Sequence, residues 1–207
     1  MAYVEYTNAD AAKAAFVNAL AGVGVEPTIS VDANALLFAQ AANSVSGVPV
    51  TQGGAGTLGT GTILKQSIAA AGDLIVTSIL IDLTGLNSGG AAGDIIGKNG
   101  SGAAYISRLS AANGTITAIR MTCLEAPAGG DDDIDLYSAT EGTGVEDVAI
   151  STLTEVQLIN SGTLASGTLV AAANMPAANT DYLYLVGQGT SNATYTAGKL
   201  LIELYGI

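Results

Sequence analysis

The sequence predicts an all-β protein: an antiparallel β-sandwich of the jelly-roll kind, with a short N-terminal helix and an extended arm. In about nine short runs after residue 61, apolar and polar residues alternate with the period of a half-buried strand. Segments rich in glycine, asparagine and proline separate these runs and read as turns. A glycine- and threonine-rich linker ends the N-terminal part, so we divide the chain into residues 1–61 and a β domain at residues 62–207.

The N-terminal part contains the one convincing helix pattern, at residues 8–24. Asn8 or Asp10 can cap its start, alanine and leucine favour its interior, and Gly22 or Gly24 can end it. The following residues 33–43, ANALLFAQAAN, fit either a second helix or an extended arm.

The β domain follows as a series of predicted strands. They lie in residues 62–68, 74–83, 103–109, 114–125, 133–138, 147–159, 167–172, 181–187 and 198–206. In the second run, Ile75, Ile79, Ile81 and Leu83 share one face. In the last run, one side carries Leu200, Ile202 and Leu204, and the other carries Lys199, Glu203 and Tyr205.

Composition argues against several classes of function. The chain has 207 residues and a formal charge of −12, and its six basic residues are scattered singly. Nucleic acids and anionic membranes need clustered basic residues, so neither is an expected partner. Only 12% of residues are charged, which suits a subunit that meets neighbours over large areas. The single cysteine, Cys123, lies in an apolar run and is expected to be a buried, inert thiol.

Catalytic and cofactor motifs are weak. The chain has no histidine, which removes the commonest general base and metal ligand. Residues 54–59, GAGTLG, fit a dinucleotide fingerprint but lead into a strand where the fingerprint needs a helix. Residues 93–99, GDIIGKN, are one residue too short for a P-loop. We therefore expect no cofactor and no enzymatic activity. The N-terminus lacks the basic start and apolar core of a signal peptide, which favours synthesis in a cytoplasm.

The acidic stretch GGDDDIDLYS, residues 129–138, is open to three interpretations. Asp131, Asp133 and Asp135 have the spacing of the first calcium ligands of an EF-hand, but the later positions of that motif do not match. An irregular cation site remains possible. The alternative is a solvated loop entering a strand, with Ile134 and Leu136 inward and Asp133 and Asp135 outward. A remote third reading is carboxylate catalysis on a carbohydrate, with candidates Asp133, Asp135, Glu141 and Glu125.

Aromatic residues are candidates for an interface. Tyr182, Tyr184 and Tyr205 fall on the polar sides of their predicted strands, where a tyrosine suits either a protein interface or the margin of the core. In the N-terminal part, the candidate interface residues are Tyr3, Tyr6, Phe16 and Leu20.

Three long stretches resemble structural proteins of marine tailed phages, notably those that infect cyanobacteria. They are residues 74–90, beginning LIVTSILIDL, residues 114–147, which include the acidic stretch, and residues 175–207, ending KLLIELYGI. The resemblance spans about residues 62–207 and includes no catalytic motif. It implies a virion component on the capsid exterior, a decoration or cement protein, assembled in the host cytoplasm. The implied partners are the major capsid protein and further copies of the chain, as a homotrimer.

Two alternatives stay open. One is a tail or head-fibre component that binds host glycan, with residues 187–198, GQGTSNATYTAG, as a candidate loop. The other is the carbohydrate-acting enzyme described above, in which Asp133 or Glu141 would be essential.

Overall fold

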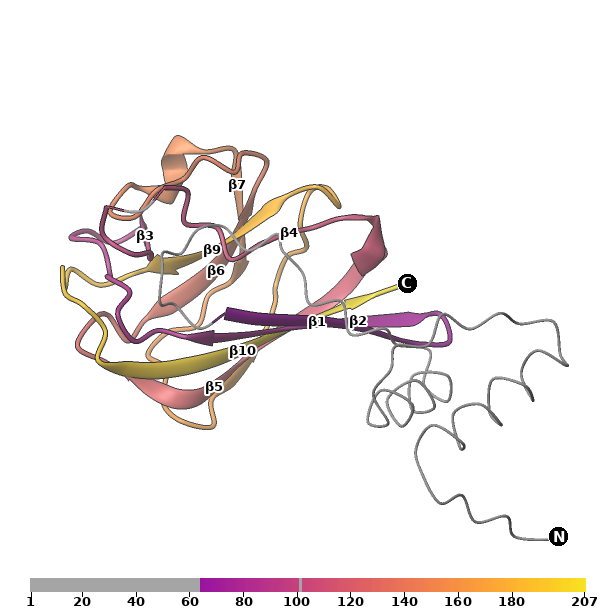
Figure 1. Ribbon diagram of the computed structural model, residues 1–207, viewed down its shortest axis with the longest axis horizontal. Helices are drawn as coiled ribbons and strands as arrows, with labels where there is room; N and C mark the ends of the chain where they lie inside the picture. The colour runs from indigo at the N-terminus through magenta and orange to yellow at the C-terminus, as the bar shows by residue number, and fades with distance from the viewer. Residues whose placement is uncertain (1–63, 101) are drawn as a thin grey trace, which may run out of the picture. The chain divides into compact units, whose positions relative to one another are not determined.

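A computed structural model describes residues 64–100 and 102–207 (Figure 1). The predicted N-terminal helix, arm and linker lie outside these residues. The described part is a β-sandwich of two packed antiparallel sheets. Its strands are β1 (Leu64–Ala71), β2 (Leu74–Asp82), β3 (Asp94–Ile95), β4 (Ser107–Arg108), β5 (Ile116–Ala128), β6 (Ile134–Ala139), β7 (Glu155–Ile159), β8 (Leu169–Ala171), β9 (Tyr182–Gly187) and β10 (Ala197–Gly206). Two single-turn 3-10 helices complete it, η1 (Ala111–Asn113) and η2 (Ile150–Thr152).

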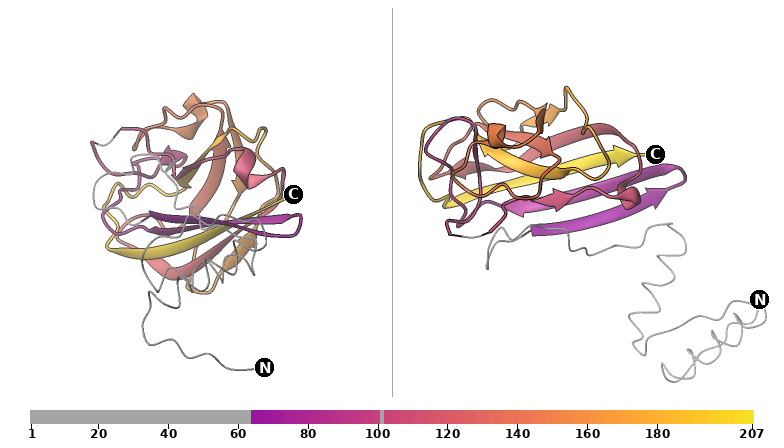
Figure 2. Two further views of the ribbon diagram at one scale, coloured as in Figure 1. Left: turned by 45° about the vertical axis from the view of Figure 1, so that its right-hand side comes forward. Right: turned by 90° about the horizontal axis from the view of Figure 1, so that it is seen from above.

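The two sheets have different strand orders. The first, which we call the β10 sheet, has the order β1-β2-β10-β5-β8. The second, the β9 sheet, has the order β3-β9-β6-β7, and β4 also pairs with β9. The long strands β1, β2, β5 and β10 run side by side in both views of Figure 2. Past the β1–β2 hairpin, the chain crosses repeatedly from one sheet to the other.

The predicted strands are confirmed. Each of the nine alternating runs overlaps one of the strands of the structure. The strand that sequence reasoning missed is β3, in the GDIIGKN segment that we considered only as a failed phosphate loop. It has two residues, too few for a period to show, and is held by pairing of Ile95 with Val186 on β9.

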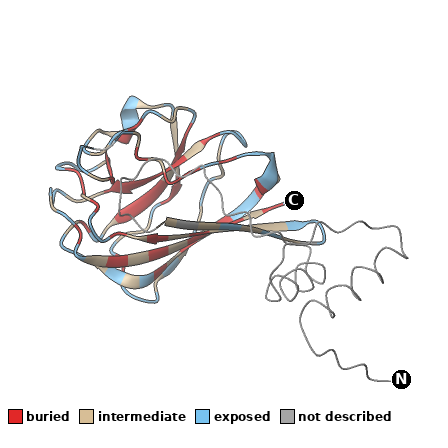
Figure 3. Ribbon diagram, viewed as in Figure 1, coloured by how far each residue is buried: buried red, intermediate tan, exposed pale blue. Residues whose placement is uncertain are grey.

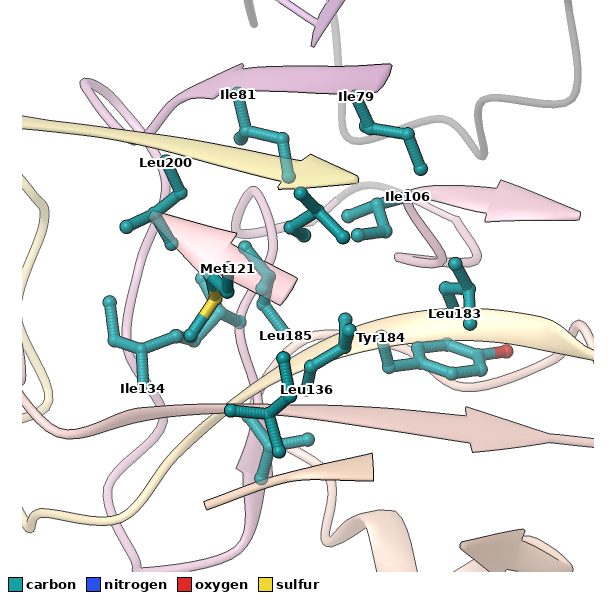
Figure 4. Close-up of a cluster of buried hydrophobic side chains, with 14 of the residues drawn as sticks. Ile79, Ile81, Ile106, Met121, Ile134, Leu136, Leu183, Tyr184, Leu185 and Leu200 are labelled. Atoms are coloured by element: carbon teal, nitrogen blue, oxygen red, sulfur yellow. The ribbon is translucent and has the colours of Figure 1, made fainter. Parts of the chain in front are cut away.

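The core lies between the sheets, where apolar side chains from both inner faces meet (Figures 3 and 4). Strand β10 alternates as expected: Leu200, Ile202 and Leu204 are fully buried and face the β9 sheet. Cys123 is fully buried too, and burial raises the pKa of its thiol, as expected for an inert cysteine.

Strand β9 is buried on both faces over residues 183–187, whereas the outer face of the β10 sheet is not buried. A loop at residues 140–153 covers the outer side of β9: Gly144 N donates to the Tyr184 hydroxyl at 3.2 Å, and a Cβ added at Gly144 would lie 2.9 Å from Tyr184 Cε1. Residues 183–187 are consequently all buried. The alternation that marks an exposed strand face is therefore lost in β9, and it persists in β10.

Candidate functional site

The acidic stretch serves mainly as a structural element where the chain enters β6. Asp135 was expected to point into solvent, but its side chain is fully buried. Its two carboxylate oxygens accept hydrogen bonds from Gln157 Nε2 at 2.7 Å and from Ser161 N at 2.8 Å. The outward direction was predicted correctly and the exposure was not, because the Gln157 side chain of the neighbouring strand β7 and the backbone at Ser161 contact its carboxylate.

Asp131 is also buried, and it ties the start of β6 to the loop after β9. Its Oδ1 accepts from Ser191 N at 3.1 Å, and its backbone carbonyl accepts from the Tyr195 hydroxyl at 2.9 Å. Gly189 permits this approach, since a Cβ there would lie 2.2 Å from Asp131 Oδ1. These contacts hold part of the loop at residues 187–198, the predicted glycan-binding segment, against the body of the domain.

Asp133 is the residue of the cluster whose charged form is disfavoured by its surroundings. Burial raises the pKa of its carboxyl, and the neighbouring charges of Asp135, Asp132 and Asp131 raise it further. Within residues 64–100 and 102–207, no group of three or more histidine, cysteine, aspartate or glutamate side chains is arranged to hold a metal ion. Asp135 uses both carboxylate oxygens to accept protein hydrogen bonds, whereas Asp131 Oδ2 and Asp133 Oδ1 are buried with no hydrogen-bond partner among the described residues. The cation site of Asp131, Asp133 and Asp135 therefore stays a prediction.

The remaining carboxylates proposed for catalysis also have structural partners. Glu141 accepts from Thr154 N at 2.9 Å and from Thr154 Oγ1 at 2.8 Å, and these bonds lower the pKa of its carboxyl. Glu125 lies on the β10 sheet, where it pairs with Lys199.

The three tyrosines of the β domain that were predicted to form an interface have different surroundings. Tyr184 is fully buried, and its hydroxyl donates to Glu141 O at 2.7 Å and accepts from Gly144 N at 3.2 Å. Burial raises the pKa of Tyr184 to about 12. This residue is therefore a core residue with no side-chain surface for a partner, contrary to the interface prediction.

The other two tyrosines remain partly exposed. The ring of Tyr182 meets that of Tyr105 edge to face at 4.8 Å, and the Arg108 guanidinium lies 5.4 Å from the Tyr182 ring centre. Tyr205 lies on the outer side of β10, with the Arg120 guanidinium 5.3 Å from its ring centre. The N-terminal candidates Tyr3, Tyr6, Phe16 and Leu20 lie outside the described residues.

The outer surface of the β10 sheet, which we call the β10 face, carries side chains in rows that follow the strand register. Its central row is mostly apolar and crosses four strands in register, and we call it the leucine row: Leu80, Leu201, Thr122 and Leu169. Leu169 is 56% exposed and the adjacent Leu124 is 46% exposed. The face thus keeps large apolar side chains in contact with solvent.

A charged row lies on each side of the leucine row, two residues away along β10. In the lysine row, Lys199 lies between Asp82 and Glu125, with its Nζ 3.9 Å from Asp82 Oδ2 and hydrogen-bonded to Glu125 Oε2. In the arginine row, Arg120 Nε donates to Glu203 Oε2 at 2.6 Å. The sequence identified Lys199 and Glu203 as pointing away from the core, but the pairing partners depend on register between distant strands and left no signal in the sequence.

Comparison with known proteins identifies no similar protein. No protein-family model matches the chain, and no curated protein or solved structure shows significant similarity to it. Among the described residues, no helix has the length and apolar character needed to span a membrane.

Proposed function

We propose that this chain is a non-enzymatic virion structural protein that binds the outer surface of a phage capsid and stabilises it. One observation carries the proposal: the stretches that resemble phage structural proteins supply central strands of both sheets. Residues 74–90 contain β2, residues 114–147 contain β5 and β6, and residues 175–207 contain β9 and β10. The resemblance thus involves the framework of the domain as well as its loops.

The strand order supports the jelly-roll form of this proposal. With the edge strand β1 left aside, the β10 sheet has the order β2-β10-β5-β8, and the facing sheet places β3 and β4 next to β9, then β6 and β7. From β2 onward the chain changes sheet at every connection except β3–β4 and β6–β7, and the last strand returns beside β2. Paired Greek keys of this kind build jelly rolls, which viral capsid domains use.

Charge supports an exterior position. The chain carries a formal charge of −12, which opposes close contact with packaged nucleic acid. In the proposal, the N-terminal residues make the capsid contact, with Tyr3, Tyr6, Phe16 and Leu20 as apolar anchors, and the β domain projects outward. Because a ligand stabilises the state that it binds, each bound copy raises the free energy needed to open the shell.

Deletion of residues 1–27 tests the anchor. The β domain should still fold, because its core is built from residues beyond the deletion. It should fail to cosediment with shells that lack the protein, whereas the full chain should saturate them. A matched control is the full chain with Val145→Asp, which changes an exposed loop side chain of the β domain. Undiminished binding by the truncated chain would refute the N-terminal anchor.

Particles without the protein test the stabilising role. They should release their genome at a lower temperature, or after milder osmotic shock, than particles with it, and added protein should restore the difference. Equal survival would show that the protein covers the shell without strengthening it. Occupancy confined to a few copies at the tail would favour the fibre alternative.

A further inference from the structure

The β10 face has an order of charges that is complementary to itself. Along β10, Lys199 and Glu203 lie two residues to either side of Leu201. On the neighbouring β5, the charges are reversed: Glu125 lies beside Lys199, and Arg120 lies beside Glu203. On β10 and β5, the face therefore presents one positive and one negative charge on each side of the leucine row, in opposite order, and Asp82 on β2 adds a further negative charge to the lysine row.

We propose that two copies of the chain pair through their β10 faces, around a two-fold axis that runs along the leucine row. Such a rotation leaves each strand opposite its own counterpart and exchanges the two charged rows. Lys199 of one copy then faces Glu203 of the second copy, and Glu125 faces Arg120. The contact is isologous, so each of these pairs forms twice.

Packing and charge act together in this arrangement. The leucine row meets itself at the centre and removes the exposed Leu169 side chain from water. The two sheets pack face to face with antiparallel strands, as aligned sheets do in sandwiches. Each intrachain ion pair stacks on the reversed pair of the second copy, which gives a square of alternating charges on β10 and β5.

The same charges explain why a second copy is the occupant. With a formal charge of −12, two copies repel each other over most of their surfaces. The β10 face is an exception, because Lys199 and Arg120, two of the chain's six basic residues, lie on it beside acidic partners. Like-charged chains can approach where both signs alternate in register. The pairing requires no capsid, and its two-fold symmetry differs from the homotrimer that the phage resemblance implies.

Reciprocal charge swaps in the full-length chain test the pairing. The first variant combines Lys199→Glu with Glu125→Lys, and the second combines Arg120→Glu with Glu203→Arg. Each keeps the ion pair between β10 and β5 and the net charge of the chain, so each should fold. The first variant also loses the 3.9 Å contact of Lys199 Nζ with Asp82 Oδ2, so its unfolding midpoint should fall slightly, whereas that of the second variant should stay close to that of the unmodified chain. In either variant alone, like charges meet across the two-fold axis. In a mixture, the swapped lysine row of one variant meets the swapped arginine row of the other.

Light scattering or sedimentation at physiological salt supplies the readout. The unmodified chain should show a mass that rises with concentration toward twice 20.4 kDa. Each variant alone should associate at least about tenfold more weakly. An equimolar mixture of the two should recover the paired mass. A further variant, Leu169→Asp, changes a 56% exposed side chain at the end of the row and should also weaken pairing, whereas Val145→Asp, 36% exposed outside the β10 face, should not.

Other outcomes would overturn the pairing. A single-chain mass at all concentrations would mean that the face is open or that residues 1–63 of the same chain cover it. A mass of three chains would contradict the two-fold axis. Variants that pair as tightly as the unmodified chain, or a mixture with no more pairing than its components, would show that these charges do not meet across an interface.

Discussion

Replacement of Asp135 by leucine separates a structural role of the acidic stretch from a metal-binding one. The buried carboxylate accepts from Ser161 N at 2.8 Å and from Gln157 Nε2 at 2.7 Å, and leucine can accept from neither. A buried donor left unpaired costs about 1–3 kcal/mol. Gln157 is half-buried and can recover some hydrogen bonding to water, so the free energy of unfolding should fall by about 2–4 kcal/mol.

Thermal and denaturant unfolding measure this loss. A domain of this size loses roughly 2–4 °C of Tm per kcal/mol, so the Tm should fall by about 5–15 °C. The matched control is Asp132→Leu, which changes the neighbouring exposed carboxylate and should alter stability by less than about 0.5 kcal/mol. Asp135→Asn keeps one acceptor oxygen and should fall between the two variants.

Measuring the Tm with and without calcium distinguishes the two roles of Asp135. If Asp135 only accepts hydrogen bonds, the Tm of the unmodified chain should be the same with calcium and with a chelator. A rise in Tm with calcium that disappears in Asp135→Leu would show that a cation site had been missed. A Leu variant as stable as the Asp132 control would refute the hydrogen-bonding account itself.

Three further predictions concern the domain. Asp133→Asn should raise the free energy of unfolding at pH 7, because the folded state raises the pKa of Asp133 and the charged carboxylate therefore destabilises the fold above that pKa. Unfolding measured over a pH range should show this stability gain fading as pH falls and the native carboxyl is protonated. A loss of stability at pH 7 would contradict this. Gly206→Ala should lower the free energy of unfolding by well over 1 kcal/mol in urea titrations, since its Cβ would lie 2.0 Å from the backbone oxygen of Asn113. An unchanged free energy of unfolding would refute the close approach. Tyr195→Phe leaves the buried Asp131 carbonyl without its 2.9 Å donor and should cost about 1–2 kcal/mol in calorimetry, and a neutral result would mean that water replaces the hydroxyl.

The burial pattern was predicted best for strands that have one face in the core and one face exposed to solvent. In residues 198–206, Leu200, Ile202 and Leu204 alternate with polar neighbours, and the structure buries the first set and leaves the second partly exposed. Period-2 alternation carries this information locally, because it records the environment of each face of one strand.

Sequence reasoning failed where distant segments cover a strand. Tyr184 and Asp135 were placed correctly on the outer side of their strands, but both are buried. The loop at residues 140–153 contacts Tyr184, and Gln157 of β7 and Ser161 contact Asp135. No local pattern reports such a cover. The ion pairs of the β10 face were equally out of reach, because Lys199 and Glu125 are 74 residues apart and meet only through sheet register.

An electron-microscopy reconstruction of the phage particle tests the proposed function most directly. The account predicts regular density for the β-sandwich at hundreds of positions on the outer surface of the shell, with its N-terminal residues toward the capsid. Density for the sandwich only at the tail, or only inside the shell, would contradict a role in capsid stabilisation, and its absence from the particle would contradict a virion role altogether.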